Sequence, residues 1–197
     1  ESADAAFAAA MTGPIPWEQA TILSDFLFYE FLGMARDAGL PVQLHTGHLA
    51  GIRNEISKAN AVHLIPTLEA FPDTGFALMH GNWPYMDEYL FLGKNHPNAF
   101  LDLCWVQGID PIYSIELMKR AVVAVPRNKV FAFGGDTDFV EQTVGFLELA
   151  KDNVAFALSD LVDNRWLSPS EARQVACDWF HNNPNEFFRL GYDRVDA

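Results

Sequence analysis

The stretch "LPVQLHTG", Leu40 to Gly47, is a short apolar run that ends on a histidine, just before a glycine. "FALMHG", Phe76 to Gly81, repeats this pattern, and "VFAFGGDT", Val130 to Thr137, ends on two glycines and an aspartate. Short runs with nearly continuous apolar character are typical of parallel strands whose sheet is covered by helices. These three stretches decide the predicted fold, and each carries a polar side chain at its end.

The segments between these runs have helical patterns. Apolar residues recur near helical spacing from residue 17 to 38 and from 111 to 125, and "NAFLDLCW", residues 98–105, predicts one more strand. Ser168 and Glu171 have the spacing of a capping box at the start of a late helix. The predicted order is α-β-α-β-α-β-α-β-α-α, which indicates an α/β fold with parallel strands and right-handed crossovers.

Length and composition predict one folded domain over residues 1–197, because half of the 197 residues are hydrophobic. We expect residues 1–16 to be an irregular segment, because Gly13, Pro14 and Pro16 interrupt a helix there. The two cysteines have no disulfide or metal-binding spacing, which favours a reducing, cytoplasmic location. The first residues lack the basic region of a signal peptide.

Charge and motif content disfavour several classes of function. The formal net charge of −13 argues against nucleic acid or an anionic membrane as a main partner. No apolar stretch approaches the ~20 residues of a membrane span. The sequence contains neither GxGxxG nor GxxxxGK[ST], and it also lacks GxSxG, so nucleotide binding and serine-hydrolase chemistry are both disfavoured.

Three polar side chains follow strand ends: His45, His80 and Asp136. In parallel α/β folds functional groups collect at the carboxyl ends of the strands. Alternation along a strand predicts that His45 shares a face with Gln43, and His80 with Leu78. Two imidazoles and a carboxylate suit a borderline ion such as zinc. The alternative is structural: each histidine is hydrogen-bonded within the fold, and the aspartate caps the following helix.

The ordered set of motifs resembles a known family. "LPVQLHTG", "FALMHG" and "VFAFGGDT" are similar to the fifth, sixth and eighth strands of amidohydrolase-related (amidohydrolase-2 type) TIM barrels, and "NAFLDLCW" fits the seventh. "NNPNEFFRLG", residues 182–191, is similar to the close of the family's last helix. The resemblance covers residues 18–191. It implies the last four strands of a TIM (β/α)8 barrel, followed by the C-terminal helices.

The resemblance also implies site roles. His45 would be a metal ligand, and His80 either a ligand or a catalytic acid/base. Asp136 would contact the metal and take a proton from the attacking water. The ion would be divalent, with zinc first and manganese or iron as alternatives. The implied reaction is hydrolysis of a C–N or C–O bond in a small polar substrate; the alternatives are a decarboxylase or other lyase, or a uronate isomerase-like enzyme.

One family feature is missing from this sequence. The first strand of such barrels carries a His-x-His pair, and no such pair occurs here. Four strands cannot close an eight-stranded barrel. We therefore expect either a homo-oligomer or association with a missing N-terminal half-barrel. The rival interpretation is a non-catalytic half-barrel that binds a ligand or partner.

Five further residues are candidates for contact with a small-molecule substrate. His48 follows the first strand end, and Trp83 and Tyr85 follow His80. Trp105 follows the seventh-strand motif, and Arg53 is a candidate for binding a substrate carboxylate. The alternatives are a solvated loop histidine, aromatic residues that cover the barrel rim, and a surface arginine.

Two residues of the "NAFLDLCW" motif are predicted to be structural. Asp102 lies between the apolar residues Leu101 and Leu103, so it should face the interior of a barrel and be hydrogen-bonded there. Cys104 should be a buried packing residue.

Overall fold

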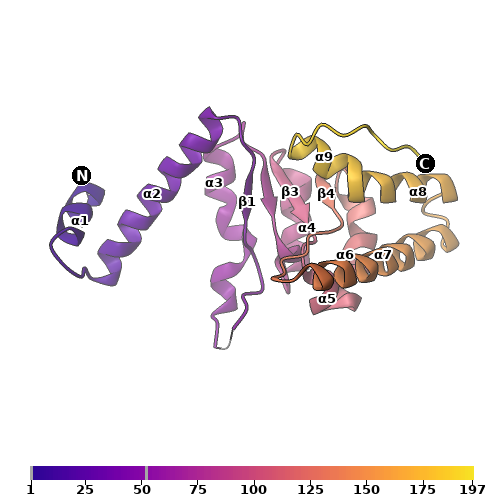
Figure 1. The fold of residues 1–197 in the computed structure, drawn as a ribbon, viewed down its shortest axis with the longest axis horizontal. Coiled ribbons are helices and arrows are strands. Elements are labelled where there is room, and N and C mark those ends of the chain that lie inside the picture. The colour runs from indigo at the N-terminus through magenta and orange to yellow at the C-terminus, as the bar shows by residue number, and fades with distance from the viewer. Residues whose placement is uncertain (1, 52) are drawn as a thin grey trace.

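The computed structural model describes residues 2–51 and 53–197. Its centre is a four-stranded parallel sheet in the order β1-β2-β3-β4, formed by Val42–Leu44, Phe76–Leu78, Ala99–Asp102 and Val130–Phe131 (Figure 1). All three strand pairs are parallel. The α/β class and the four strand positions are therefore confirmed. Each strand is shorter than its motif, because the residues after it turn away to form loops.

Helices connect the strands and cover one face of the sheet. The chain runs through α1 (Ser2–Ala10) and α2 (Trp17–Asp37) to β1, and then through the 3-10 helices η1 (Ile56–Ala59) and η2 (Ala61–Leu64) to α3 (Ile65–Ala70). The later elements are η3 (His80–Asn82), α4 (Met86–Asn95), α5 (Val106–Ile109), α6 (Pro111–Ala124), η4 (Arg127–Lys129), α7 (Val140–Asp163), α8 (Pro169–Cys177), the π-helix η5 (Asp178–Asn182) and α9 (Asn183–Phe187).

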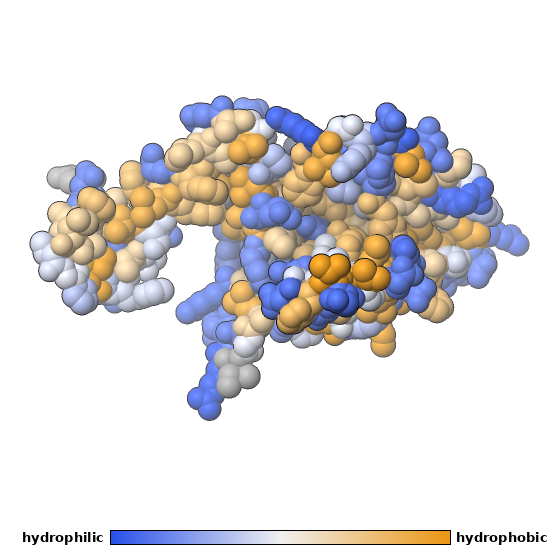
Figure 2. Space-filling model, viewed as in Figure 1, coloured by the Kyte–Doolittle hydropathy of each residue, from blue (hydrophilic) through white to orange (hydrophobic). Residues whose placement is uncertain are grey.

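The sequence predicted an irregular N-terminal segment over residues 1–16, and this prediction is wrong. Residues Ser2–Ala10 form helix α1, and the predicted break at the glycine and prolines lies between α1 and α2. The run of alanines favours a helix, so the breakers only end it. Helix α1 and the first half of α2 extend away from the rest of the chain, whereas the second half of α2 packs against the core through Leu32 and Ala35 (Figure 1), and Figure 2 shows apolar surface along both helices. Trp17, Leu27 and Phe31 are among their exposed large side chains.

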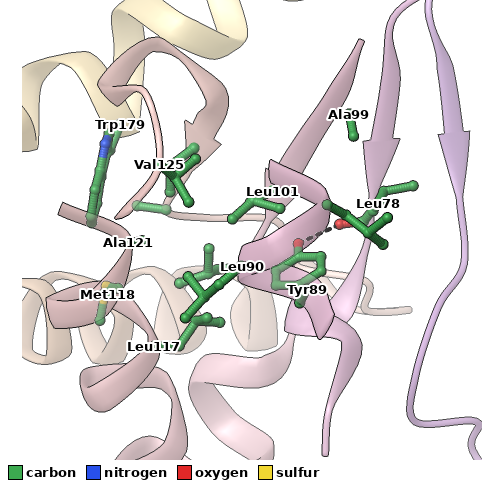
Figure 3. Close-up of a cluster of buried hydrophobic side chains, with 14 of the residues drawn as sticks. Leu78, Tyr89, Leu90, Ala99, Leu101, Leu117, Met118, Ala121, Val125 and Trp179 are labelled. Carbon is green, nitrogen blue, oxygen red and sulfur yellow. Dashed lines mark hydrogen bonds between the residues drawn. The ribbon is translucent and has the colours of Figure 1, made fainter. Parts of the chain in front are cut away.

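The strand register assigns the two faces of the sheet. Leu44, Leu78, Leu101 and Val130 are neighbours across the four strands, and all belong to or pack against the hydrophobic core. Figure 3 shows part of this core, in which side chains of β2 and β3 lie next to those of α4 and α6. Burial of this face holds the helices against the sheet.

The opposite face is the one that a closed barrel would enclose. It carries Gln43, Ala77, Phe100 and Phe131. Phe187 of α9 covers part of this face, with its ring centroid 4.6 Å from that of Phe100 and 5.1 Å from that of Phe131. The "NNPNEFF" motif therefore brings the end of the chain back onto the sheet.

The C-terminal segment also occupies the outer edge of β4. The Ala132 N–H donates to the Trp179 carbonyl at 3.0 Å, and the Asn183 side-chain amide donates to the Val130 carbonyl at 2.8 Å. These bonds satisfy backbone groups that a neighbouring strand would otherwise pair. At the other edge, β1 pairs only with β2 within the described residues. The sheet is therefore covered at one edge and open at the other.

Helix ends follow the predicted local chemistry. Ser168 and Glu171 form the predicted capping box, with both reciprocal hydrogen bonds present. Asp110 caps α6 by accepting the Tyr113 N–H, and Pro111 occupies the first helical position.

Cys104 and Cys177 are both free. Within the described residues, no helix combines the length and apolar character that a membrane span requires. The cytoplasmic location stays a prediction.

Candidate active site

The side chains predicted to converge do so at the carboxyl ends of the strands. The His45 and His80 ring centroids are 4.1 Å apart, and His80 Nε2 lies 3.8 Å from Asp136 Oδ2. His80 is fully buried, whereas the Asp136 side chain is 47% exposed. His45 is exposed as well. The three residues thus form a small polar cluster that opens to solvent on the side of His45 and Asp136.

His80 does not reach the cluster by simple strand alternation. The sequence predicted that it shares a face with Leu78, but that face packs against the helices. The strand ends at Leu78, and His80 adopts a positive φ of 64° at the start of η3. This turn carries the imidazole from the helix-covered face to the site. Asp136 also has a positive φ, of 44°, in the loop after β4.

Gly47 allows the His45 loop to lie directly on the His80 loop. Its φ is +65°, and a Cβ at this position would lie 2.5 Å from the backbone carbon of Asn82. Only glycine fits such a close backbone contact at a positive φ. The Thr46 hydroxyl adds a hydrogen bond of 2.6 Å to the Met79 carbonyl. The glycine after the first strand end thus allows the two histidine loops to pack together.

The hydrogen bond of His80 fixes its tautomer. Nδ1 lies 3.1 Å from the carbonyl oxygen of Cys104, which can only accept, so Nδ1 carries the hydrogen. Nε2 of the neutral ring then has a free lone pair and no hydrogen. It is buried and has no hydrogen-bond partner within the described residues. A buried polar atom without a partner is uncommon, and here it lies beside the carboxylate of Asp136.

Both imidazoles of the cluster are held in the neutral form. Burial, and then the proximity of His45, lower the pKa of His80. Partial desolvation lowers the pKa of His45, while Asp136 acts in the opposite direction. Neutral imidazoles are the form that binds metal ions or accepts protons.

An aromatic group lies next to the cluster. The ring of His48 is 5.6 Å from Trp83 and 5.2 Å from Trp105, measured between centroids, and Trp105 is 5.7 Å from His80. Trp105 has a positive φ of 60°, which directs it out of the strand path. His48, Trp83 and Trp105 are therefore brought together beside His80, and their contact with a substrate stays a prediction.

Two other substrate candidates do not join this group. Tyr85 begins the turn into α4, where its backbone bonds to Asn82. Arg53 is exposed in the loop before η1 with a φ of 63°, and the described residues give it no contact with the histidines. Their proposed role stays a prediction.

The structure adds two residues that the sequence did not link to the site. The backbone of Cys104 orients His80, and the side chain of Asn82 holds the loops in place by accepting the Ala61 N–H and donating to the Tyr85 carbonyl. Backbone contacts leave no mark on side-chain patterns, so Cys104 was recognisable only as a buried residue. Asn82 carried a weak signal in "HGN", directly after the strand-end histidine.

The cluster is not by itself a complete metal cage. Within residues 2–51 and 53–197, no group of three or more histidine, cysteine, aspartate or glutamate side chains has the arrangement that would hold an ion. The donor types nevertheless fit a divalent ion, because two neutral imidazoles and a carboxylate face one another, and one nitrogen lacks a partner.

Comparison with solved structures supports the barrel. A protein from Lactobacillus casei described as a "putative metal-dependent hydrolase" matches with a TM-score of 0.73 at 18% identity, over 85% of this chain and 44% of that one. An uncharacterised TIM-barrel protein from Bordetella bronchiseptica matches with a TM-score of 0.52 at 20% identity, over 82% of this chain and 50% of that one. The chain is thus a four-stranded part of an α/β barrel.

Sequence comparison gives the family. Protein fluG from Emericella nidulans is 26% identical over 178 residues, which are 85% of this chain and 20% of fluG. The chain thus spans a fifth of that relative and half or less of the two solved structures. The family model described as "Amidohydrolase" matches residues 4–190. With nearly its whole length inside that match, the chain belongs to the amidohydrolase family.

Proposed function

We propose that this chain carries one side of the active site of a metal-dependent hydrolase that cleaves a C–N or C–O bond in a small polar substrate. The observation that carries the proposal is the convergence of His45, His80 and Asp136 at the strand ends, with the unpartnered Nε2 of His80 3.8 Å from Asp136 Oδ2. Membership of the amidohydrolase family implies a divalent metal.

The proposed roles follow from the geometry. A divalent ion bound here would act as a Lewis acid and make water nucleophilic at neutral pH. His45 and Asp136 would hold it from the exposed side, and zinc is the first expectation for this donor set. His80 contributes its Nε2 lone pair, either as a further ligand or as a base that takes a proton. Asp136, 3.8 Å away, stabilises the imidazolium formed in the second case.

The residues around the cluster shape where a substrate lies. Trp83, Trp105 and His48 form a half-buried aromatic wall beside His80, which would exclude water from one side of the bound molecule. The lyase and isomerase alternatives use the same cluster. Hydrolysis is favoured because the cluster opens to solvent on the side of His45 and Asp136, so water reaches it.

Metal content tests the proposal. The chain, purified without chelator and measured by plasma mass spectrometry, should hold near-stoichiometric zinc, manganese or iron. The variant His45→Ala/Asp136→Ala should lose that metal, because two of the donors are removed. The matched control His63→Ala/Asp138→Ala alters two exposed residues outside the cluster and should keep it. A parent chain without metal, also after incubation with zinc, would overturn the proposal for this chain.

We further propose that the open side of the sheet associates with other half-barrel units, in the isolated chain with a second copy. The exposed apolar side chains of α1 and α2 and the open edge of β1 support this. Leu27 and Phe31, 54% and 58% exposed, lie four residues apart and share one face of α2.

Sedimentation velocity at micromolar concentration tests this association. We expect a species heavier than the 22.0 kDa monomer. Leu27→Glu/Phe31→Glu should shift the population to the monomer, because the charges make burial of this face unfavourable. Ile112→Glu/Val123→Glu, at exposed positions of α6, should not. A monomeric parent chain would count against the proposal.

A further inference from the structure

Asp102 is connected to His80 by two hydrogen bonds that meet at Cys104. The Cys104 N–H donates to Asp102 Oδ1 at 2.9 Å, and the Cys104 carbonyl accepts from His80 Nδ1 at 3.1 Å. Asp102 is 4% exposed and His80 fully buried. Water therefore does not compete for either bond, and each fixes its partner more firmly than on the surface.

The bond from Asp102 shapes the turn in which Cys104 lies. A carboxylate that accepts the N–H two residues ahead forms an Asx turn, which ends the strand and sets the direction of the next peptide group. β3 does end at Asp102, and Trp105 then adopts a φ of 60°. Most residues avoid that conformation, so it needs support from its surroundings. The Trp105 N–H donates to the Gly134 carbonyl at 2.9 Å, and the Val106 N–H donates to the Cys104 carbonyl at 2.7 Å. These two bonds support the turn together with the bond to Asp102.

Tyr89 holds together the ends of the two strands, β2 and β3, from which the His80 and Cys104 turns begin. Its hydroxyl lies 2.6 Å from the Leu78 carbonyl and 3.1 Å from the Asp102 carbonyl, so it joins β2 to β3 just before both strands end. Figure 3 shows the bond to Leu78. His80 follows Leu78 by two residues, and Cys104 follows Asp102 by two. The starting points of both turns are thus tied to one buried side chain.

We propose that Asp102 is a positioning residue of the active site: by accepting the Cys104 N–H, it orients the Cys104 carbonyl that holds His80 in the Nδ1–H tautomer. Nε2 is then presented to Asp136 and His45 without a proton. This rests on the same site as the proposed function. Its direct consequence is the tautomer of a histidine, which is measured without metal and without turnover.

The test is nitrogen NMR of the histidine rings in the metal-free, 15N-labelled chain at slightly alkaline pH. An imidazole nitrogen that lacks a proton resonates far from one that carries it, and a His80→Gln spectrum assigns the signals. Wild-type His80 should show the Nδ1–H tautomer. In Asp102→Ala the ratio of Nδ1–H to Nε2–H should fall about fivefold, as expected from losing roughly one hydrogen bond.

Two further variants separate positioning from general destabilisation. Asp102→Asn keeps an oxygen acceptor and should retain the wild-type tautomer. Asn98→Ala removes a buried polar side chain just before β3, which donates to the Leu68 and Phe71 carbonyls, and should also leave His80 unchanged. A wild-type Nε2–H tautomer overturns the proposal, even if Asp102→Ala fails to fold. An unchanged ratio in folded Asp102→Ala, or a lost tautomer in Asp102→Asn, overturns it as well.

The outcome is independent of metal content. A chain without metal that shows the predicted tautomer would refute the proposed hydrolase site but leave the role of Asp102 intact. A metal-loaded chain with the wrong tautomer would do the reverse.

Discussion

Replacing His80 by alanine should lower the rate at which the zinc-loaded chain hydrolyses 4-nitrophenyl acetate by about 10²–10⁴-fold, the usual contribution of a positioned acid/base group. The reason is geometric. Nε2 of His80 is buried, has no hydrogen-bond partner within the described residues and lies 3.8 Å from Asp136 Oδ2; burial lowers the pKa of His80, which keeps Nε2 available for a proton or an ion at neutral pH. Steady-state kinetics of parent and variant provide the measurement.

His63→Ala is the matched control for this experiment. His63 lies on the exposed side of η2, where its Nε2 is 2.9 Å from the Ser57 carbonyl, and its removal should leave the rate unchanged. Metal content of His80→Ala then separates the two roles left open above. Retained metal with a lost rate assigns an acid/base, and loss of both assigns a ligand. A His80→Ala variant as fast as the parent would show that this cluster is not the catalytic one.

The second large effect is a pH dependence of stability that arises from Asp102. Burial raises the pKa of this carboxyl from 3.8 to about 7, although the hydrogen bond from the Cys104 N–H partly opposes the shift. Below about pH 4 the carboxyl is protonated in both states. As pH rises towards 7, the unfolded chain releases its proton and the folded chain retains it, so the free energy of unfolding falls. Above pH 7, the raised pKa of Asp102 lowers the free energy of unfolding by about 4 kcal/mol relative to its value at low pH.

Asp102→Asn should remove this dependence, because an amide does not titrate. Urea unfolding of both proteins at several pH values from about 4 to 8 measures the difference in unfolding free energy. That difference should shift in favour of the variant by about 4 kcal/mol over this range. Asn98→Ala should lower the free energy of unfolding by a similar amount at every pH, since neither asparagine nor alanine titrates in this range. Parallel curves for wild type and Asp102→Asn would contradict the raised pKa.

Much of the fold was predictable because its signals are local. The apolar runs fixed the strands, Ser168 and Glu171 fixed a helix start, and strand-end polarity pointed to His45, His80 and Asp136. Each rests on residues that lie close together in the sequence, or on the rule that parallel strands end at one edge.

The parts that were not predictable depend on backbone conformation or on distant contacts. Alternation placed His80 on the helix-covered face, because nothing in "FALMHG" shows that the strand stops at Leu78 and that φ then becomes positive. The glycine and prolines at residues 13–16 led to the prediction of an irregular segment, although helix α1 forms before them. The role of the Cys104 carbonyl depends on a residue 24 positions away in the chain.

The covered edge of β4 has a consequence for how chains can assemble. Trp179 and Asn183 occupy hydrogen-bonding positions that an incoming strand would need, whereas β1 has no such cover within the described residues. A sheet with two open edges can add units without limit and grow into fibres, but a sheet with one can join a single neighbour. If two copies of this chain pair through β1, the pairing would therefore stop at a closed two-fold pair, because the C-terminal segment covers the edge that further copies would need.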